Sequence, residues 1–280
     1  MTSATDEPDI SDKSVGIIGV GTIGSTIIEG LINNGVLEPS QICGSTAHEE
    51  SATKAQERLG IQVYSTNDKV VERSDTILLA VKPQVMGTVV DEIAPILSDE
   101  KLLITVAAAV TTEYIEKKLK GDLPVIRAMP NTPATVNEGV TVLCPGKHAT
   151  DSDLTLAKKI FQPVGLVEVL REEKLMDAVT GLSGSGPAYG YLIIEALIEA
   201  GVKVGLPRDL ARTLASQSLL GAAKMVLETG KHPAELKDMV TTPAGVTVDG
   251  IMKLEEGGIR VALIKAIVEA TDKSGQLNVS

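Results

Sequence analysis

Short, nearly continuous apolar runs alternate with helical stretches over the first half of the chain. Strands that are apolar on both faces are typical of a parallel sheet covered by helices on both sides. The alternation therefore predicts βαβ units and an α/β domain. The candidate strands are Val15–Val20, Ile42–Gly44, Thr76–Val81, Leu102–Ala107, Val125–Met129, Gly139–Leu143 and Leu166–Leu170. Helices are expected at Thr22–Asn34, Gln84–Leu97 and Ala149–Phe161.

After Glu172 the pattern changes to helices separated by Gly and Pro. These are expected at Met176–Thr180, Pro187–Val204, Pro207–Thr229, Pro233–Met239, Gly245–Leu254 and Ile259–Lys273. Small Ala and Gly residues recur along them, which allows close packing and mildly favours an interlocked dimer over a monomeric helical core. We divide the chain into a flexible leader (1–12), a Rossmann-type dinucleotide-binding domain (13–170) and an all-α dimerisation and catalytic domain (171–280).

Composition excludes several functional classes. The 280 residues carry a net charge of −11 and only five aromatic side chains, which leaves neither a basic footprint nor a stacking platform for nucleic acid. Two separated cysteines and three scattered histidines have no metal-ligand spacing, so no metal is indicated. The polar N-terminal stretch has no apolar signal region, and no apolar run reaches membrane-spanning length. We therefore expect a soluble, cytoplasmic protein with no membrane partner.

A glycine fingerprint, Gly19-Val20-Gly21-Thr22-Ile23-Gly24, follows the first strand and opens the first helix. In this context GxGxxG predicts a dinucleotide site: a tight turn at Gly19, close approach of pyrophosphate at Gly21, and a helix N-terminus facing the phosphates. An ordinary strand-to-helix turn is the alternative.

A second glycine segment, Gly181-Leu182-Ser183-Gly184-Ser185-Gly186-Pro187, opens a long apolar helical tract. Pro187 suits the first turn of a helix, and glycine lets the backbone approach a ligand closely. The segment lacks the Lys-Ser/Thr ending of a P-loop, so nucleotide hydrolysis is not indicated. We expect this first turn to pack against something bound by the first half.

The choice of cofactor depends on the end of the second strand. About 20 residues after the glycine fingerprint, NAD-selective sites place an acidic residue on the ribose. Here the stretch Cys43–His48 has no carboxylate, and Ser45 and Thr46 offer hydroxyl donors, which favours NADPH and leaves NADH possible. Capping of the next helix is the alternative role for both hydroxyls.

Several segments together resemble one family, the pyrroline-5-carboxylate reductases, over nearly the full chain. The segment Leu236–Thr247 is the most specific, because it is similar to the family's signature loop. The other matching segments are Ala80–Gln84, Met129–Pro133, Asp177–Tyr189, Gly201–Pro207 and His232–Gly258.

The resemblance implies hydride transfer from NAD(P)H to the C=N carbon of 1-pyrroline-5-carboxylate, which gives L-proline in the last step of its biosynthesis. It also implies a homodimer or higher homo-oligomer. Thr247 is the implied catalytic residue, a positioning group and proton relay, and Gly245, Val246 and Thr247 are the implied substrate-binding residues. The implied cofactor contacts are Gly19, Gly21, Thr22, Ile23, Gly24, Ser45, Asn67, Ala80, Val81, Lys82, Pro83, Ala107, Ala109, Met129 and Asn131.

The chain departs from the family pattern at a few of these positions. The family usually has Asn-Met at Thr22-Ile23, often Ser at Thr242, and Gly at Ala109 and Ala244. Ala244 matters most, because an added methyl is costly if that position needs positive φ.

Three alternatives to this reading differ in class. A β-hydroxyacid dehydrogenase has a catalytic Lys and an Asn on the first helix of its second domain, but Gly190 and Ile194 stand at those positions, so the base that alcohol oxidation needs is missing. Reduction of another cyclic imine stays open, because ring size depends on pocket volume. A non-catalytic NADP-binding regulatory protein is the third.

Overall fold

The computed structural model describes residues 10–277, and these divide into two compact units. The first unit runs to Gly184 and also takes in the segment from Ala270 onwards, and the second is Ser185–Glu269. The boundary expected at 170/171 lies just after the last strand, which ends at Val169, and the first unit continues beyond it to Gly184. Most of the expected leader, residues 1–9, lies outside the described residues, while Ile10 is buried against the core.

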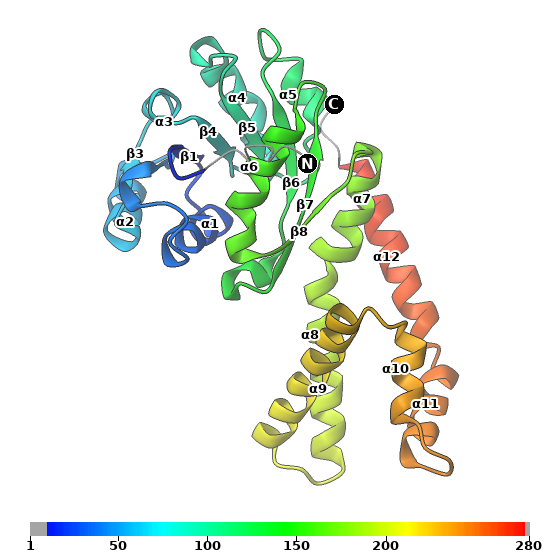
Figure 1. Ribbon diagram of the computed structural model, residues 1–280. Helices are drawn as coiled ribbons and strands as arrows, with labels where there is room; N and C mark the ends of the chain where they lie inside the picture. Colours follow the sequence, from blue (N-terminus) through cyan, green and yellow to red (C-terminus); the bar gives the residue numbers. More distant parts are fainter. Residues whose placement is uncertain (1–9, 278–280) are drawn as a thin grey trace, which may run out of the picture. The chain divides into compact units, whose positions relative to one another are not determined.

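One twisted sheet forms the centre of the first unit (Figure 1). Its strand order is β3-β2-β1-β4-β5-β6-β7-β8; β1 to β6 run parallel, β7 is antiparallel to β6, and β8 is parallel to β7. The strands are β1 (Val15–Ile18), β2 (Ile42–Ser45), β3 (Gln62–Tyr64), β4 (Thr76–Leu79), β5 (Leu102–Thr105), β6 (Val125–Met129), β7 (Gly139–Pro145) and β8 (Gly165–Val169).

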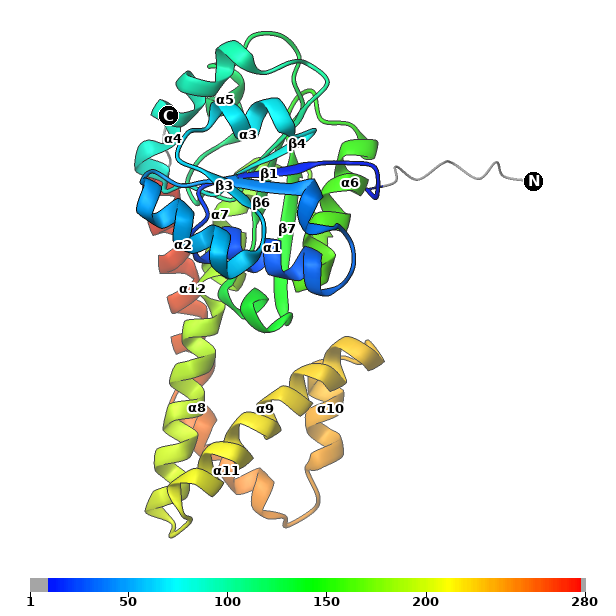
Figure 2. The ribbon, with the colours of Figure 1, turned by 90° about the vertical axis from the view of Figure 1, so that its left-hand side faces the viewer.

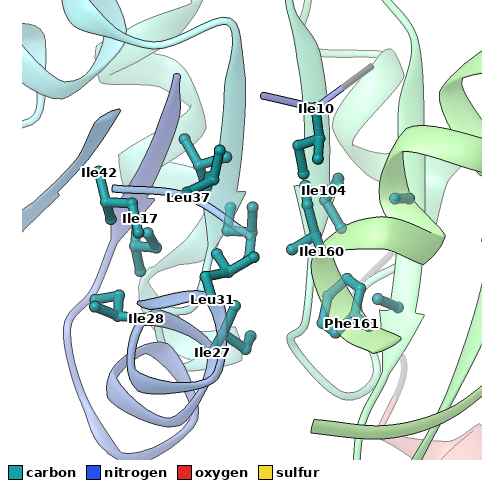
Figure 3. Packing of buried hydrophobic residues seen from close by; sticks show 14 of the residues in the cluster. Ile10, Ile17, Ile27, Ile28, Leu31, Leu37, Ile42, Ile104, Ile160 and Phe161 are labelled. Carbon is teal, nitrogen blue, oxygen red and sulfur yellow. The ribbon is translucent and has the colours of Figure 1, made fainter. Parts of the chain in front are cut away.

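Helices cover both faces of this sheet, as the apolar strands predict. On one face α1 (Thr22–Asn33), α2 (Glu49–Leu59) and α6 (Asp151–Phe161) form a core with the strands. Figure 3 shows this packing, in which Ile27 and Leu31 of α1 and Phe161 of α6 are labelled. On the other face α3 (Asp68–Arg73), α4 (Pro83–Ile93) and α5 (Thr112–Glu116) form a second core. The predicted Rossmann-type domain is thus confirmed.

The remaining helices include one short helix of the first unit, α7 (Met176–Val179), and the helices of the second half: α8 (Gly186–Lys203), α9 (Arg208–Thr229), α10 (Pro233–Val240), α11 (Val246–Glu256) and α12 (Ile259–Gln276). Within the second unit α8 and α9 meet closely at their connecting turn, because Gly201 leaves room for the methyl of Ala211. Figure 2 shows the two helices diverging from this turn. The all-α second half is also confirmed.

Candidate functional site

The carboxyl ends of β1, β2, β4, β5 and β6 lie along one edge of the sheet, because these strands are parallel. The strand order reverses between β1 and β4. In open α/β sheets, ligands bind at such a reversal, outside the carboxyl ends of the strands. The cofactor residues expected from the sequence in the first unit follow these strand ends.

The three glycines of the fingerprint have three different physical roles. Gly19 has φ of +99°, and a Cβ there would lie 2.8 Å from the carbonyl oxygen of Ala80. A Cβ on Gly24 would lie 2.7 Å from the carbonyl oxygen of Gly19, so this glycine lets α1 pack closely on β1. At Gly21 a Cβ meets nothing within 4 Å. The protein's own packing therefore does not require glycine at Gly21, which fits close approach by a ligand.

The N-terminus of α1 opens toward the same edge. Its N-cap, Gly21, provides no side-chain hydrogen bond, and Gly21 and Thr22 are exposed. The first N–H groups of a helix have no partner within the helix, and together with the helix dipole they attract an anion. Residues 21–24 therefore fit a pyrophosphate.

Ser45, the residue expected at the ribose end, is the last residue of β2. Its carbonyl oxygen accepts hydrogen bonds from the N–H groups of Gly19 and Val20, each at 3.0 Å. Its side chain is only 1% exposed, and its hydroxyl donates to Oδ1 of Asn67 at 2.7 Å. The Thr46 hydroxyl donates to the carbonyl oxygen of His48 at 3.0 Å. Both hydroxyls expected as donors to the ribose are thus engaged within the chain, and neither caps α2.

Asn67 is held by a second, acidic partner that the sequence did not indicate. Its Nδ2 donates to Oε2 of Glu92 at 3.0 Å. Glu92 lies on α4, 47 positions beyond Ser45 (92 minus 45), so the residues near the end of β2 do not include it. The structure thus brings a carboxylate to Asn67, an expected cofactor contact, although the stretch Cys43–His48 has none.

The loops after β4 and β5 provide the next expected contacts. Ala80 and Val81 flank Gly19, and Lys82 is the exposed N-cap of α4, with Pro83 in its first turn. A free lysine beside a helix N-terminus suits a phosphate.

After β5, Ala107 and Ala109 are both buried, and Ala109 has φ of +63°. This position therefore adopts a conformation that glycine prefers.

Met129 and Asn131, at the end of β6, connect to the second glycine segment. The Asn131 amide accepts from the N–H of Val140 at 3.0 Å and donates to the carbonyl oxygen of Ser183 at 3.1 Å. Gly184 leaves room for the Met129 side chain, whose Cε lies 2.8 Å from where a Cβ would stand. The segment Thr180–Gly184 forms a π-helical turn before α8. Gly184 therefore allows close packing against β6.

The expected substrate residues lie in the second unit, between α10 and α11. Gly245 is the N-cap of α11, and a Cβ there would lie 2.4 Å from the Thr242 hydroxyl. Ala244 is exposed with φ of +59°. Thr247 does not cap α11, since Gly245 does, and its hydroxyl forms no hydrogen bond with any described residue. The hydroxyl of Thr247 and the first N–H groups of α11 are thus available to a ligand.

A buried ion pair in the first unit has no counterpart in the predicted site. The Arg127 side chain is 2% exposed, and its Nη1 lies 3.4 Å from Oε1 of Glu173. Glu173 also accepts from the N–H and the hydroxyl of Thr112, at 2.8 and 2.5 Å. The Nε and Nη2 of Arg127 have no hydrogen-bond partner among the described residues. Burial and the charge of Glu173 raise the pKa of the neighbouring Cys144 thiol to about 11.

Between residues 10 and 277, no helix combines the length and apolar character needed to cross a bilayer. The same residues contain no group of three or more His, Cys, Asp or Glu side chains arranged to hold a metal ion.

Family models of known proteins match parts of both halves of the chain. A family model described as "Pyrroline-5-carboxylate reductase dimerisation" matches residues 173–277. A second, described as "NADP oxidoreductase coenzyme F420-dependent", matches residues 14–109. The two matches correspond to the helical half and to the strands around the glycine fingerprint.

Curated relatives and solved structures carry the same family name. The chain is 46% identical to the pyrroline-5-carboxylate reductase of Methanosarcina acetivorans, over 96% of this chain and 99% of that protein. The Escherichia coli enzyme is 40% identical, over 96% of this chain and 100% of that protein. The structure of the Coxiella burnetii reductase matches with a TM-score of 0.90 and 36% identity, over 96% and 99%. The structure of the Plasmodium falciparum reductase, solved with NADP bound, matches with a TM-score of 0.85 and 31% identity, over 96% of this chain and 99% of that chain.

Proposed function

The chain belongs to the pyrroline-5-carboxylate reductase family, and we propose that it reduces 1-pyrroline-5-carboxylate to L-proline with the residues described above. It is accordingly an NAD(P)H-dependent oxidoreductase of proline biosynthesis. The bound nicotinamide supplies a hydride for the imine carbon, and the nitrogen gains a proton as the C=N bond becomes CH–NH. A cyclic iminium is already electrophilic, so the protein needs mainly to position the reactants.

Residues of the first unit hold the cofactor in this proposal. Gly19, Gly21 and Gly24 let the pyrophosphate approach the uncapped N-terminus of α1. Ser45 and Asn67 form the ribose end, and Lys82 adds a positive charge above α4. The contacts proposed toward the nicotinamide are Ala80, Val81, Ala107, Ala109, Met129 and Asn131. The space at Gly21 is the observation that best supports cofactor binding here.

Residues at the start of α11 hold the substrate. The N–H groups of Val246 and Thr247 lie where a helix attracts an anion, which suits the carboxylate of the imine. The Thr247 hydroxyl is suited to hydrogen-bond the ring nitrogen. The free hydroxyl of Thr247 at an uncapped helix N-terminus is the single observation that carries the substrate assignment.

Turnover and Thr247 variants test this function. Purified protein is expected to oxidise NADPH when 1-pyrroline-5-carboxylate is added. Thr247→Ala should lower kcat/KM about tenfold, the worth of one hydrogen bond of about 1.4 kcal/mol, while NADPH binding stays the same. Thr247→Ser retains the hydroxyl and should restore most of the rate. Thr241→Ala is the control, because the Thr241 hydroxyl already donates to the carbonyl oxygen of Lys237. Wild-type efficiency in Thr247→Ala would remove Thr247 from the mechanism.

NADPH is the proposed preferred cofactor, because the end of β2 and the loop after it, residues 43–48, contain no carboxylate. Parallel assays with NADPH and NADH measure the preference. The cytoplasm stays the proposed location.

A homo-oligomer formed by the helical half is also proposed. Large apolar side chains stand exposed on its helices, among them Leu192 at 67% and Ile264 at 61%. Such faces are typical of protein interfaces, and the matched family model is described as a dimerisation region. Leu192→Glu and Ile264→Glu should lower the mass measured by sedimentation. Val136→Glu, at an equally exposed residue of the first unit, is the control.

A further inference from the structure

The ribose end of the cofactor site contains a continuous chain of hydrogen bonds that ends in a carboxylate. Gly19, in the pyrophosphate loop, donates its N–H to the carbonyl oxygen of Ser45 at 3.0 Å. The Ser45 hydroxyl donates to Oδ1 of Asn67 at 2.7 Å, and Nδ2 of Asn67 donates to Glu92 at 3.0 Å. Glu92 is thus connected to the cofactor loop through two side chains.

The partners of Asn67 fix which way its amide faces. An ionised carboxylate only accepts hydrogen bonds, so the nitrogen of the Asn67 amide must face Glu92. The amide oxygen then faces the Ser45 hydroxyl, which must donate. This leaves the second N–H of Nδ2 for a ribose hydroxyl, which is an acceptor as well as a donor. Glu92 therefore orients the group proposed to contact the ribose.

We propose that Glu92 is a specificity-determining residue that weakens the preference for NADPH over NADH. The proposal rests on the proposed function and deepens it. In NAD-selective sites a carboxylate at the end of the second strand favours a ribose 2′-hydroxyl over a 2′-phosphate. Here the carboxylate comes from α4 and is linked to Ser45, at the end of the second strand, through Asn67. Its negative charge opposes the 2′-phosphate, and its hydrogen bond supports Asn67 for either cofactor.

Charge and hydrogen bonding are separable by substitution. Glu92→Gln removes the charge but keeps an oxygen that accepts from Asn67. It should tighten NADPH binding about three- to tenfold, the effect of one unit charge near a phosphate in water, and leave NADH binding within about twofold. Glu92→Ala removes the acceptor as well and should weaken NADH binding several-fold relative to Glu92→Gln.

A matched control lies on the same helix. Asp91 precedes Glu92 and pairs with Lys118, at 2.9 Å, instead of with Asn67. Asp91→Asn changes the net charge by the same amount and should leave the ratio of the two dissociation constants unchanged. The Glu92→Gln gain for NADPH should shrink between about 50 mM and 500 mM salt, because the Debye length falls below about 5 Å.

Binding is measured by fluorescence titration of NADPH and NADH on the full chain, without the imine. An unchanged ratio in Glu92→Gln, or an equal change in Asp91→Asn, overturns the proposal, and equal NADH binding by Glu92→Ala and Glu92→Gln overturns the orienting role. A protein that binds both cofactors but does not reduce the imine contradicts the proposed function alone. The two failures are therefore distinguishable.

Discussion

Two alanines held in the left-handed conformation give a stability prediction of definite sign. Ala244 and Ala109 have φ of +59° and +63°. A residue with a Cβ pays about 1–2 kcal/mol in this region, while glycine in its place pays about 0.5–1 kcal/mol more backbone entropy. Ala244 is exposed, so Ala244→Gly loses no buried methyl. This substitution should stabilise the protein by about 0.5–1 kcal/mol.

Ala109 is the matched case, because it has the same backbone conformation in a buried position. Its side chain is 6% exposed. Removing a buried methyl costs about 0.8 kcal/mol, which offsets the relief of strain. Ala109→Gly should therefore change the free energy of unfolding by less than about 0.5 kcal/mol. The difference between the two variants isolates the contribution of burial.

Thermal unfolding of the full chain at one fixed protein concentration measures both effects. Because 1 kcal/mol shifts the Tm of a protein near this size by about 2–4 °C, Ala244→Gly should raise it by about 2 °C. Ala223, exposed in the interior of α9, is the control, and Ala223→Gly should lower the Tm, since glycine costs about 1 kcal/mol in a helix. A fall in Ala244→Gly as large as that in Ala223→Gly would refute the strain argument.

Three residues of the first unit are further targets for substitution: Ser45, Glu173 and Cys144. Ser45→Asp should weaken binding of NADPH relative to NADH in fluorescence titrations, and Ser45→Ala, which loses only the bond to Asn67, should leave their ratio unchanged. Glu173→Ala should lower the free energy of unfolding in urea by about 3 kcal/mol, because Arg127 is left as an uncompensated buried charge; an unchanged midpoint would count against the ion pair. Burial raises the pKa of Cys144 from 9.0 to about 11. The folded thiol then keeps a proton that the unfolded thiol loses, so stability should fall as the pH rises from about 9 through 11. Cys144→Ala should flatten that fall, and equal slopes in both proteins would contradict the shift.

The sequence predicts the architecture well where burial leaves a clear pattern. Strands β1, β4 and β5 are buried throughout, so their apolar runs stand out. Strand β3 was missed, because Gln62–Tyr64 is three residues long, lies at the sheet edge and begins with an exposed side chain. Helix ends agree to within a few residues because Gly and Pro mark them.

The site was only partly predictable, because its least expected members come from distant elements. The glycine fingerprint is local: Gly19 has the positive φ of a tight turn, and the space beside Gly21 fits the approach of pyrophosphate that the spacing predicts. Glu92, in contrast, meets Asn67 only through the fold. The same is true of Glu173, which meets Arg127 in a buried ion pair outside the predicted site. No signal in the sequence places either carboxylate. The sequence could not show whether Ala244 has a positive φ, and the backbone of the structure shows that it does.

The return of the chain to the first unit has a consequence for how this protein is made. The chain leaves that unit at Gly184 and re-enters it at Ala270, and the hydroxyl of Ser274 then donates to Asp177 at 2.7 Å. A ribosome delivers residue 274 after Glu269, so the first unit gains this contact only after the whole second unit has been synthesised. Domains usually fold in the order in which they emerge. Here the unit that emerges first is completed last, and chains cut short before Ala270 lack its closing segment.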